Sequence, residues 1–134
     1  MNVRKLVLLL VVSLCTACTA LNIQNRSDKF ELSLRQYGSA LRWGHWTDAY
    51  SYHITRDKKQ PEVDIEKLER FSIAGFGILE QIMDPEGTEV IILVDINYYD
   101  EQIGTLRNIR QQQVWWFNEE TKRWLTESDF PDLK

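Results

Sequence analysis

The chain has 134 residues, with 16 lysines and arginines against 20 aspartates and glutamates, and a formal net charge of −4. This length suits one small domain with a single hydrophobic core. A nucleic acid partner is disfavoured, because the chain lacks the basic patch that such partners require. Both cysteines, Cys15 and Cys18, lie near the N-terminus, so no disulfide is expected to hold the core together.

The first residues have the order of a secretory signal peptide. Arg4 and Lys5 precede the apolar block Leu6–Leu14, and small residues follow it. Positive charge, apolar block and small residues in this order are typical of a segment that is cleaved during export. The block is shorter than the roughly 20 residues that a transmembrane helix needs, so we expect residues 1–17 to be removed rather than kept as a membrane span.

The stretch LCTAC that ends this segment resembles the lipobox of bacterial lipoproteins. In that motif small residues, here Thr16 and Ala17, precede a cysteine that is acylated and becomes the first residue of the mature protein. Cys15 takes the position that leucine usually holds. The resemblance implies that Cys18 is lipidated. It also implies that Thr19, in place of aspartate, directs the protein to the outer membrane, facing the periplasm.

Ordinary secretion is the alternative, with cleavage after Ala20 and a soluble periplasmic or secreted product. Under the lipoprotein interpretation, residues 18–26 form a lipidated tether and residues 27–134 a single domain. Removal of Arg4 and Lys5 takes the formal net charge from −4 to −6. Acidic head groups repel an acidic domain, so we expect acyl chains to hold the protein at the membrane.

A helix is predicted from Ser27. Four apolar residues recur there at helical spacing: Phe30, Leu34, Tyr37 and Leu41. Asp28 is expected to cap the start of this helix, with Glu31 three residues later. Gly44 is expected to end it, because glycine tolerates a left-handed conformation.

A second, short helix is predicted from Trp46 or Thr47. Its further members are Ala49, Tyr50 and His53. The charge run Arg56–Lys59 is typical of a solvated loop, and Pro61 breaks the helical pattern.

The second half of the chain changes to the alternation of β-strands. Four strands are predicted: Leu68–Met83, Glu89–Tyr99, Thr105–Phe117 and Arg123–Glu127. In the second strand, five apolar residues share one face: Val90, Ile92, Val94, Ile96 and Tyr98. The turn residues Asp84–Gly87 indicate a hairpin, and Gly75 and Gly77 indicate a bulge or a close backbone approach. The sequence therefore predicts an α+β fold, with N-terminal helices packed on a curved antiparallel meander.

Two stretches, Tyr37–Tyr52 and Gln111–Pro131, resemble the helix-glycine-helix opening and the last aromatic hairpin of the nuclear transport factor two-like superfamily. The resemblance implies a cone-like sheet curled around the N-terminal helices. Relatives use the cavity of this cone as an enzyme site, a ligand pocket or a filled core, so the fold alone does not decide the chemistry. Trp43, Trp46 and Trp124 are interpreted as packing residues of the core or its rim, with a binding surface as the alternative.

The residues nearest to a catalytic set are Asp95, Tyr99 and His53. Asp95 and Tyr99 share one face of the second predicted strand, and an aspartate buried beside tyrosines can act as a base. Ketosteroid isomerases and certain dehydratases of the superfamily place a carboxylate or a histidine in the cone for proton transfer. No metal or cofactor is expected, because His45 and His53 show no ligand spacing and the sequence contains no nucleotide-binding motif.

Two functions therefore stay open. The first is an exported, membrane-anchored lipoprotein whose domain binds a protein partner in the cell envelope without catalysis. The second is a small-molecule binder, or an enzyme of the isomerase or dehydratase type, that uses the cone cavity. An open cavity converging on Asp95, Tyr99 or His53 would favour the second function, and a cone filled with Trp, Phe and Ile side chains would contradict it.

Overall fold

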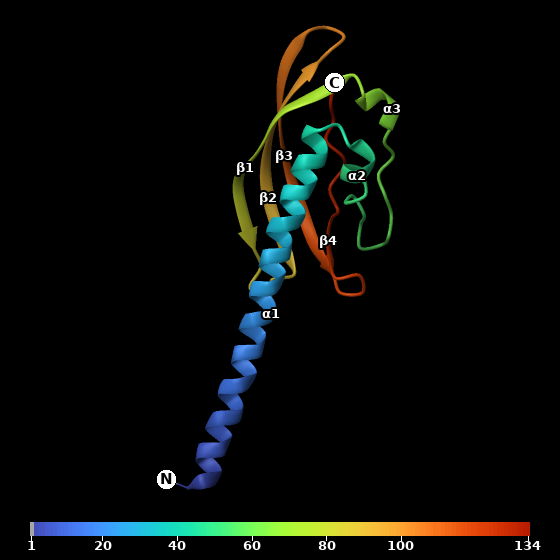
Figure 1. Cartoon of the computed structure of the whole chain (residues 1–134). Coiled ribbons are helices and arrows are strands. Elements are labelled where there is room, and N and C mark those ends of the chain that lie inside the picture. The colour runs from blue at the N-terminus through green and yellow to red at the C-terminus, as the bar shows by residue number, and fades with distance from the viewer. Residues whose placement is uncertain (1) are drawn as a thin grey trace.

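The computed structural model describes residues 2–134, which form three helices followed by four strands (Figure 1). The helices are α1 (Val3–Arg42), α2 (Trp46–Tyr50) and α3 (Ile65–Leu68), and the strands are β1 (Phe71–Met83), β2 (Glu89–Asp100), β3 (Thr105–Asn118) and β4 (Arg123–Thr126). The strands form one antiparallel sheet in the order β1-β2-β3-β4. The predicted α+β fold is confirmed, with the C-terminal half of α1 packed against a four-stranded meander.

α1 is one uninterrupted helix of 40 residues. The predicted start at Ser27 with a cap at Asp28 is wrong, because both residues lie well inside the helix. Residues 18–26, which the lipoprotein interpretation assigns to a tether, are helical as well. No proline or glycine precedes Gly38, so no residue of this stretch interrupts the helical hydrogen bonds.

The N-terminal half of α1 projects from the domain as an exposed apolar helix. An 18-residue window of α1 has a mean hydropathy of 2.4 and none of it is buried, so the helix is long and apolar enough to cross a membrane. The uncharged run Leu6–Ile23 is about 27 Å long at 1.5 Å per residue. The block Leu6–Leu14 alone is short for a span, but the helix that contains it is not, and this helix fits either a signal sequence or a membrane anchor.

α1 ends as predicted just before Gly44, which has a left-handed φ of +69°. α2 lies where it was predicted, but it stops before His53. His53 instead forms a parallel bridge to Thr126, the last residue of β4. The short helix α3, capped by Asp64, is not among the predicted elements.

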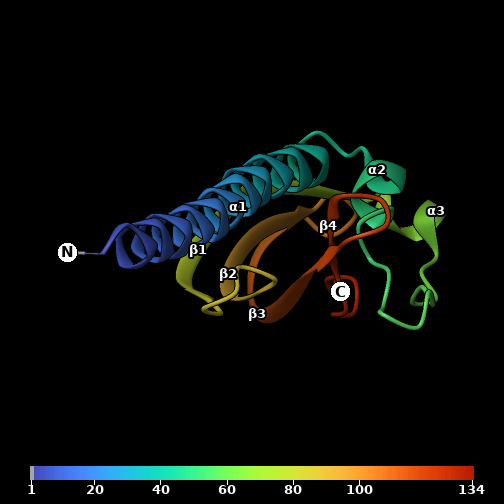
Figure 2. The same ribbon diagram turned by 90° about the horizontal axis from the view of Figure 1, so that it is seen from below.

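α1 lies across the concave side of the curved sheet (Figure 2). The five residues predicted to share one face of β2 are all buried. Phe30 of α1 packs edge-on against Trp115 and Trp124, at ring-centroid distances of 5.9 and 5.1 Å, and Tyr37 packs against Trp115 at 5.3 Å. Trp46 and Trp124, two of the tryptophans interpreted as packing residues, are buried. Aromatic and aliphatic side chains therefore fill the space beneath α1.

α1 and β1 make a close contact at Gly38. A Cβ atom there would lie 2.8 Å from the ring of Phe76. Two register shifts in β1, one on each side of Gly75–Gly77, confirm the predicted irregularity of this strand. However, Cβ atoms added at Gly75 and Gly77 would meet their nearest neighbours at ordinary distances of 3.5 and 3.9 Å. The position that needs glycine for packing is therefore on the helix and not on the strand.

We expect Gly38→Val to lower the free energy of unfolding by about 1–3 kcal/mol, because the added side chain must displace the Phe76 ring. Unfolding in urea followed by circular dichroism measures the change. Ser39→Val, at an exposed position of the same helical turn, is the matched control for the low helix propensity of valine. Equal losses in the two variants would contradict the close packing.

Candidate functional site

Two cysteines lie one helical turn apart on the projecting part of α1. Cys15 and Cys18 are both free and exposed, as are all the described residues before Ile23. Ile23 is the first partly buried residue of the helix. At 1.5 Å per residue, Cys18 precedes it by about 7.5 Å along the axis. The Cys18 thiol is therefore open to a modifying enzyme and close to the folded domain.

Arg26 fixes α1 on the two turns at this end of the sheet. Its guanidinium forms an ion pair with Glu119 in the β3–β4 turn and donates to the carbonyl of Glu86 in the β1–β2 turn at 3.3 Å. It also lies over the ring of Phe117, 5.2 Å from the centroid. Trp124 donates its indole N–H to the Arg26 carbonyl at 2.9 Å. Both turns therefore lie at the end of the domain from which the apolar half of α1 projects (Figure 1).

Side chains fill the interior of the domain, in the place where the sequence left open a cone-shaped cavity. The largest fully buried side chains include Trp115, Trp124, Tyr37 and Phe30. The main hollows lie at the surface, such as a groove of about 560 Å³ between α1 and α2 that includes Gln36 and Asp48. Asp95, Tyr99 and His53 do not line this groove. The structure therefore places the candidate catalytic residues away from this groove.

Asp95 and Tyr99 lie on the outer face of β2, opposite the core. The Asp95 carboxylate accepts hydrogen bonds from Asn108 Nδ2 at 3.1 Å and from Arg110 Nε at 3.0 Å. These hydrogen bonds hold the pKa of the Asp95 carboxyl below its usual value. A general base for neutral pH needs a pKa near 7, and the pKa of this carboxyl is shifted away from that value. Its hydrogen bonds to Asn108 and Arg110 instead join β2 to β3. Tyr99 is 40% exposed and lies four residues further along the strand, about 13 Å away.

His53 is fully buried on the side of the sheet that faces α1. Its Nε2 lies 3.0 Å from the hydroxyl of Tyr37, and its Nδ1 lies 2.8 Å from the carbonyl of Ser128. Because a carbonyl only accepts, Nδ1 carries the proton and Nε2 accepts from the Tyr37 hydroxyl. Burial lowers the pKa of His53 to about 4, so the imidazole is neutral at pH 7. His53 therefore lies on the opposite side of the sheet from Asp95 and Tyr99, and the structure does not bring the three candidates together.

Gln113 extends the buried polar cluster around His53. Its Nε2 lies 3.4 Å from the Tyr37 hydroxyl, and its Oε1 accepts a hydrogen bond from Trp115 Nε1 at 3.0 Å. Burial also raises the pKa of Tyr37. Sequence reasoning placed Tyr37 on an apolar helix face and missed Gln113. The available signal is the alternation of β3, which puts Gln113 on the same face as Trp115.

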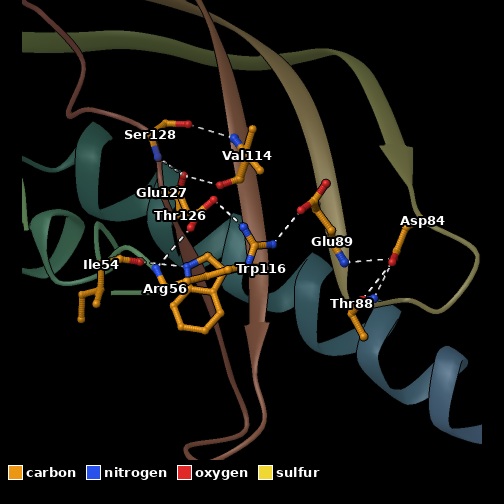
Figure 3. A network of polar contacts seen from close by, with 10 residues as sticks. All are labelled: Ile54, Arg56, Asp84, Thr88, Glu89, Val114, Trp116, Thr126, Glu127 and Ser128. Atoms are coloured by element: carbon orange, nitrogen blue, oxygen red, sulfur yellow. Dashed lines mark hydrogen bonds and ion pairs between the residues drawn. The ribbon is translucent and has the colours of Figure 1, made fainter. Parts of the chain in front are cut away.

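A second polar network, around Arg56, was also missed (Figure 3). The charge run that begins at Arg56 is typical of solvated loops, but this guanidinium pairs with Glu127 and, at 2.6 Å, with Glu89. It lies 5.7 Å from the centroid of the Trp116 ring, and Trp116 donates its indole N–H to the carbonyl of Ile54 at 2.8 Å. One cation thus joins two carboxylates, and the network holds the loop after α2 against the sheet.

In the part of the chain that the structure describes, no group of three or more His, Cys, Asp or Glu side chains is placed to hold a metal ion. Comparison of the chain with models of protein families, with curated proteins and with solved structures finds no match. The features from which a function can be argued are therefore the exposed cysteine on a projecting apolar helix, the packed interior and the surface of the domain.

Proposed function

We propose that the protein is an exported bacterial lipoprotein, held at the outer membrane by acyl chains on Cys18, whose domain binds another envelope protein without catalysis. The observation that carries the proposal is the exposed Cys18 thiol. It follows the apolar block Leu6–Leu14 and precedes Ile23, the first partly buried residue of α1, by about 7.5 Å of helix.

Cleavage before Cys18 is compatible with the fold. Residues 2–17 are all exposed, so their removal takes no buried side chain from the core. The remaining part of α1 keeps its apolar contacts with the sheet from Phe30 to Leu41. Packing of such an apolar face supplies most of the stability of a helix in a protein, so the shortened α1 stays folded on the sheet.

The position of Cys18 sets the orientation of the domain. Acyl chains at Cys18 bring the β1–β2 and β3–β4 turns towards the membrane, because Arg26 joins α1 to both turns. These turns carry the acidic residues Glu86, Glu119 and Glu120, which acidic head groups repel. Attachment then depends on the acyl chains, and two or more chains make it stable.

The absence of catalysis in this proposal rests on the state of the candidate groups. The Asp95 carboxylate is hydrogen-bonded to Asn108 and Arg110, and His53 is enclosed by Tyr37 and Ser128. The arrangement of α1 on a curved meander supports the resemblance to the nuclear transport factor two-like superfamily. We place the domain with those members whose cone is a filled core and do not retain the isomerase, dehydratase or small-molecule alternative.

Metabolic labelling with a fatty acid analogue tests the anchor. The full chain is expressed in a bacterial host as wild type, as Cys18→Ser and as Cys15→Ser. We expect label in the wild type and in Cys15→Ser, and none in Cys18→Ser, because only Cys18 follows the small residues of the lipobox. Both variants change an exposed thiol one turn apart on α1, so Cys15→Ser is the matched control.

Two outcomes contradict the lipid anchor. Label that persists in Cys18→Ser places the acyl chain elsewhere. An unlabelled wild type that nevertheless remains in the membrane fraction shows that α1 itself is the anchor, as its length and hydropathy of 2.4 permit.

A further inference from the structure

We propose that the free edge of β1 and the groove beside it bind an extended, acidic and apolar segment of the partner protein, which adds a strand to the sheet. This inference rests on the proposed function and specifies the surface that an envelope partner contacts. The groove between α1 and β1, called here the α1–β1 groove, has a volume of about 450 Å³. Its lining includes Leu34, Trp43, Phe76, Ile78, Arg35 and Arg42.

β1 is a long edge strand with one partner. Its 13 residues pair with β2, and within residues 2–134 no strand pairs with its other edge. Edge strands are normally protected by short length, by lysines, by proline or by bulges. β1 has register shifts between Ile73 and Gly75 and between Ile78 and Glu80, which leave residues 75–78 and 80–83 in regular pairing. β1 contains no lysine or proline, and Glu80 is its only charged residue. The opposite edge strand, β4, has only four residues, so β1 is the edge that offers an extended row of backbone donors and acceptors.

Apolar side chains are exposed along this edge. Trp43, which was interpreted from the sequence as a packing residue, is 71% exposed, and Ile78 is 38% exposed in the same groove. On β1 itself, Leu79 at the second register shift and Ile82, opposite Ile91 on the outer face of the sheet, are exposed by 48% and 66%. Trp43 and Ile78 line one groove, and apolar surface gathered at one place marks an interaction site more often than scattered apolar residues do. A bound strand would cover these groups while it pairs with the backbone.

The charges of the α1–β1 groove select the partner. Arg35 and Arg42 line it, and neither guanidinium has an ion pair or a side-chain hydrogen bond to any other residue that the structure describes. Glu31, the acidic residue of the lining, accepts a hydrogen bond from the Gln81 amide at 2.9 Å. In a chain with a net charge of −4, two free guanidinium groups beside an apolar groove favour carboxylates of a partner.

A second copy of this chain does not fit the edge when both copies are anchored in one membrane. α1 and β1 are antiparallel. Glu31 contacts Gln81, whereas Gly38, further along α1, lies beside Phe76, which comes earlier in β1. Antiparallel pairing of two β1 strands requires a two-fold axis perpendicular to the sheet. That axis makes the two α1 helices antiparallel, so their N-terminal halves project from opposite ends of the dimer. The occupant is therefore a strand of a different protein.

Photo-crosslinking in intact cells tests this inference with the full, anchored chain. A photoreactive phenylalanine analogue replaces Ile78 in the groove or, as the matched control, Ile103 in the β2–β3 turn, which is also exposed, by 58%. We expect a discrete product from position 78 only. We also expect the partner peptide joined to it, identified by mass spectrometry, to alternate apolar residues with aspartate or glutamate.

Charge reversal provides the second measurement. Arg35→Glu with Arg42→Glu is expected to reduce the crosslinked fraction about tenfold or more, since two attractive charge pairs with the partner become repulsive. Both residues are exposed, so the circular dichroism spectrum should stay unchanged. Lys29→Glu with Lys67→Glu, which also reverses two charges but outside the groove, should leave the product intact.

Several outcomes overturn the inference. They are no product, equal products from positions 78 and 103, a product made of two copies of this chain, a basic partner peptide, or a yield that charge reversal does not change. Lipid labelling at Cys18 separates this failure from that of the proposed function. Label at Cys18 without a product refutes the β1 surface alone, and a product without label refutes the lipid anchor alone.

Discussion

Replacing Phe30 by alanine is expected to lower the free energy of unfolding by about 3–5 kcal/mol, which is a large part of the stability of a domain of this size. Phe30 is fully buried and packs between the rings of Trp115 and Trp124. Removal of its ring leaves a cavity between α1 and the sheet, because the surrounding side chains are held in place by α1, β3 and β4. Unfolding in urea, monitored by tryptophan fluorescence, measures the loss.

The control for this prediction is Leu32→Ala, on the same helix and 48% exposed. We expect a change within about 0.5 kcal/mol for this variant. A similarly small effect of Phe30→Ala would show that the space beneath α1 is loosely filled. That result would reopen the cone cavity as a ligand site.

The stability of the domain is expected to fall by about 3 kcal/mol between pH 6.5 and pH 4 through His53 alone. Burial lowers the pKa of His53 to about 4 in the folded protein, against the hydrogen bond to Ser128 and the charge of Asp129. The unfolded chain binds this proton already near pH 6.5. Between these two values the unfolded state therefore binds more protons, so stability is fully present above pH 6.5 and is lost as the pH falls.

Urea unfolding at several pH values between 7.5 and 4.5, for the wild type and for His53→Gln, measures this effect. The variant lacks the titrating group, so its stability should be nearly constant over this range even if it is lower throughout. The carboxyl groups of Asp84, Asp95 and Glu119 also have lowered pKa values; the ordinary values are 3.8 for aspartate and 4.5 for glutamate. Their contribution to stability is therefore lost at lower pH than that of His53. An equal decline in both proteins would show that His53 is not the group responsible.

Local patterns were sufficient to predict the sheet. The alternation of Val90, Ile92, Val94, Ile96 and Tyr98 identifies the buried face of β2, because successive side chains of a strand point to opposite sides. All five are buried in the structure. The turn residues between β1 and β2 likewise predict a hairpin without knowledge of its neighbours.

The start of α1 was mispredicted because two signals overlap. Asp28 and Glu31 have the spacing of a helix cap, and the residues before them lack apolar periodicity. The capping pattern is one that a continuous helix can also contain, and no proline or glycine stops the helix there. Periodicity reports which face is buried, and residues 2–22 have no buried face, so it could not show that this stretch is helical.

Of the candidate site, only the lipobox at Cys18 can be stated from the sequence, and its lipidation stays a prediction. The lipobox resemblance is carried by consecutive residues, so the sequence suffices to state it. The roles of Asp95, Tyr99 and His53 depend on which elements lie beside them. His53 meets Tyr37 and Ser128, which are 16 residues before it and 75 residues after it in the chain, and no spacing rule relates such positions. The contact of Gly38 with Phe76 depends in the same way on the packing of α1 against β1.

The most direct test of the lipid anchor is the intact mass of the protein purified from the membrane fraction of a bacterial host. The account predicts a single species that begins at Cys18 and carries the mass of its acyl chains. A species that retains residues 1–17 without acyl chains, or one that begins at Leu21 and carries no lipid, would contradict it.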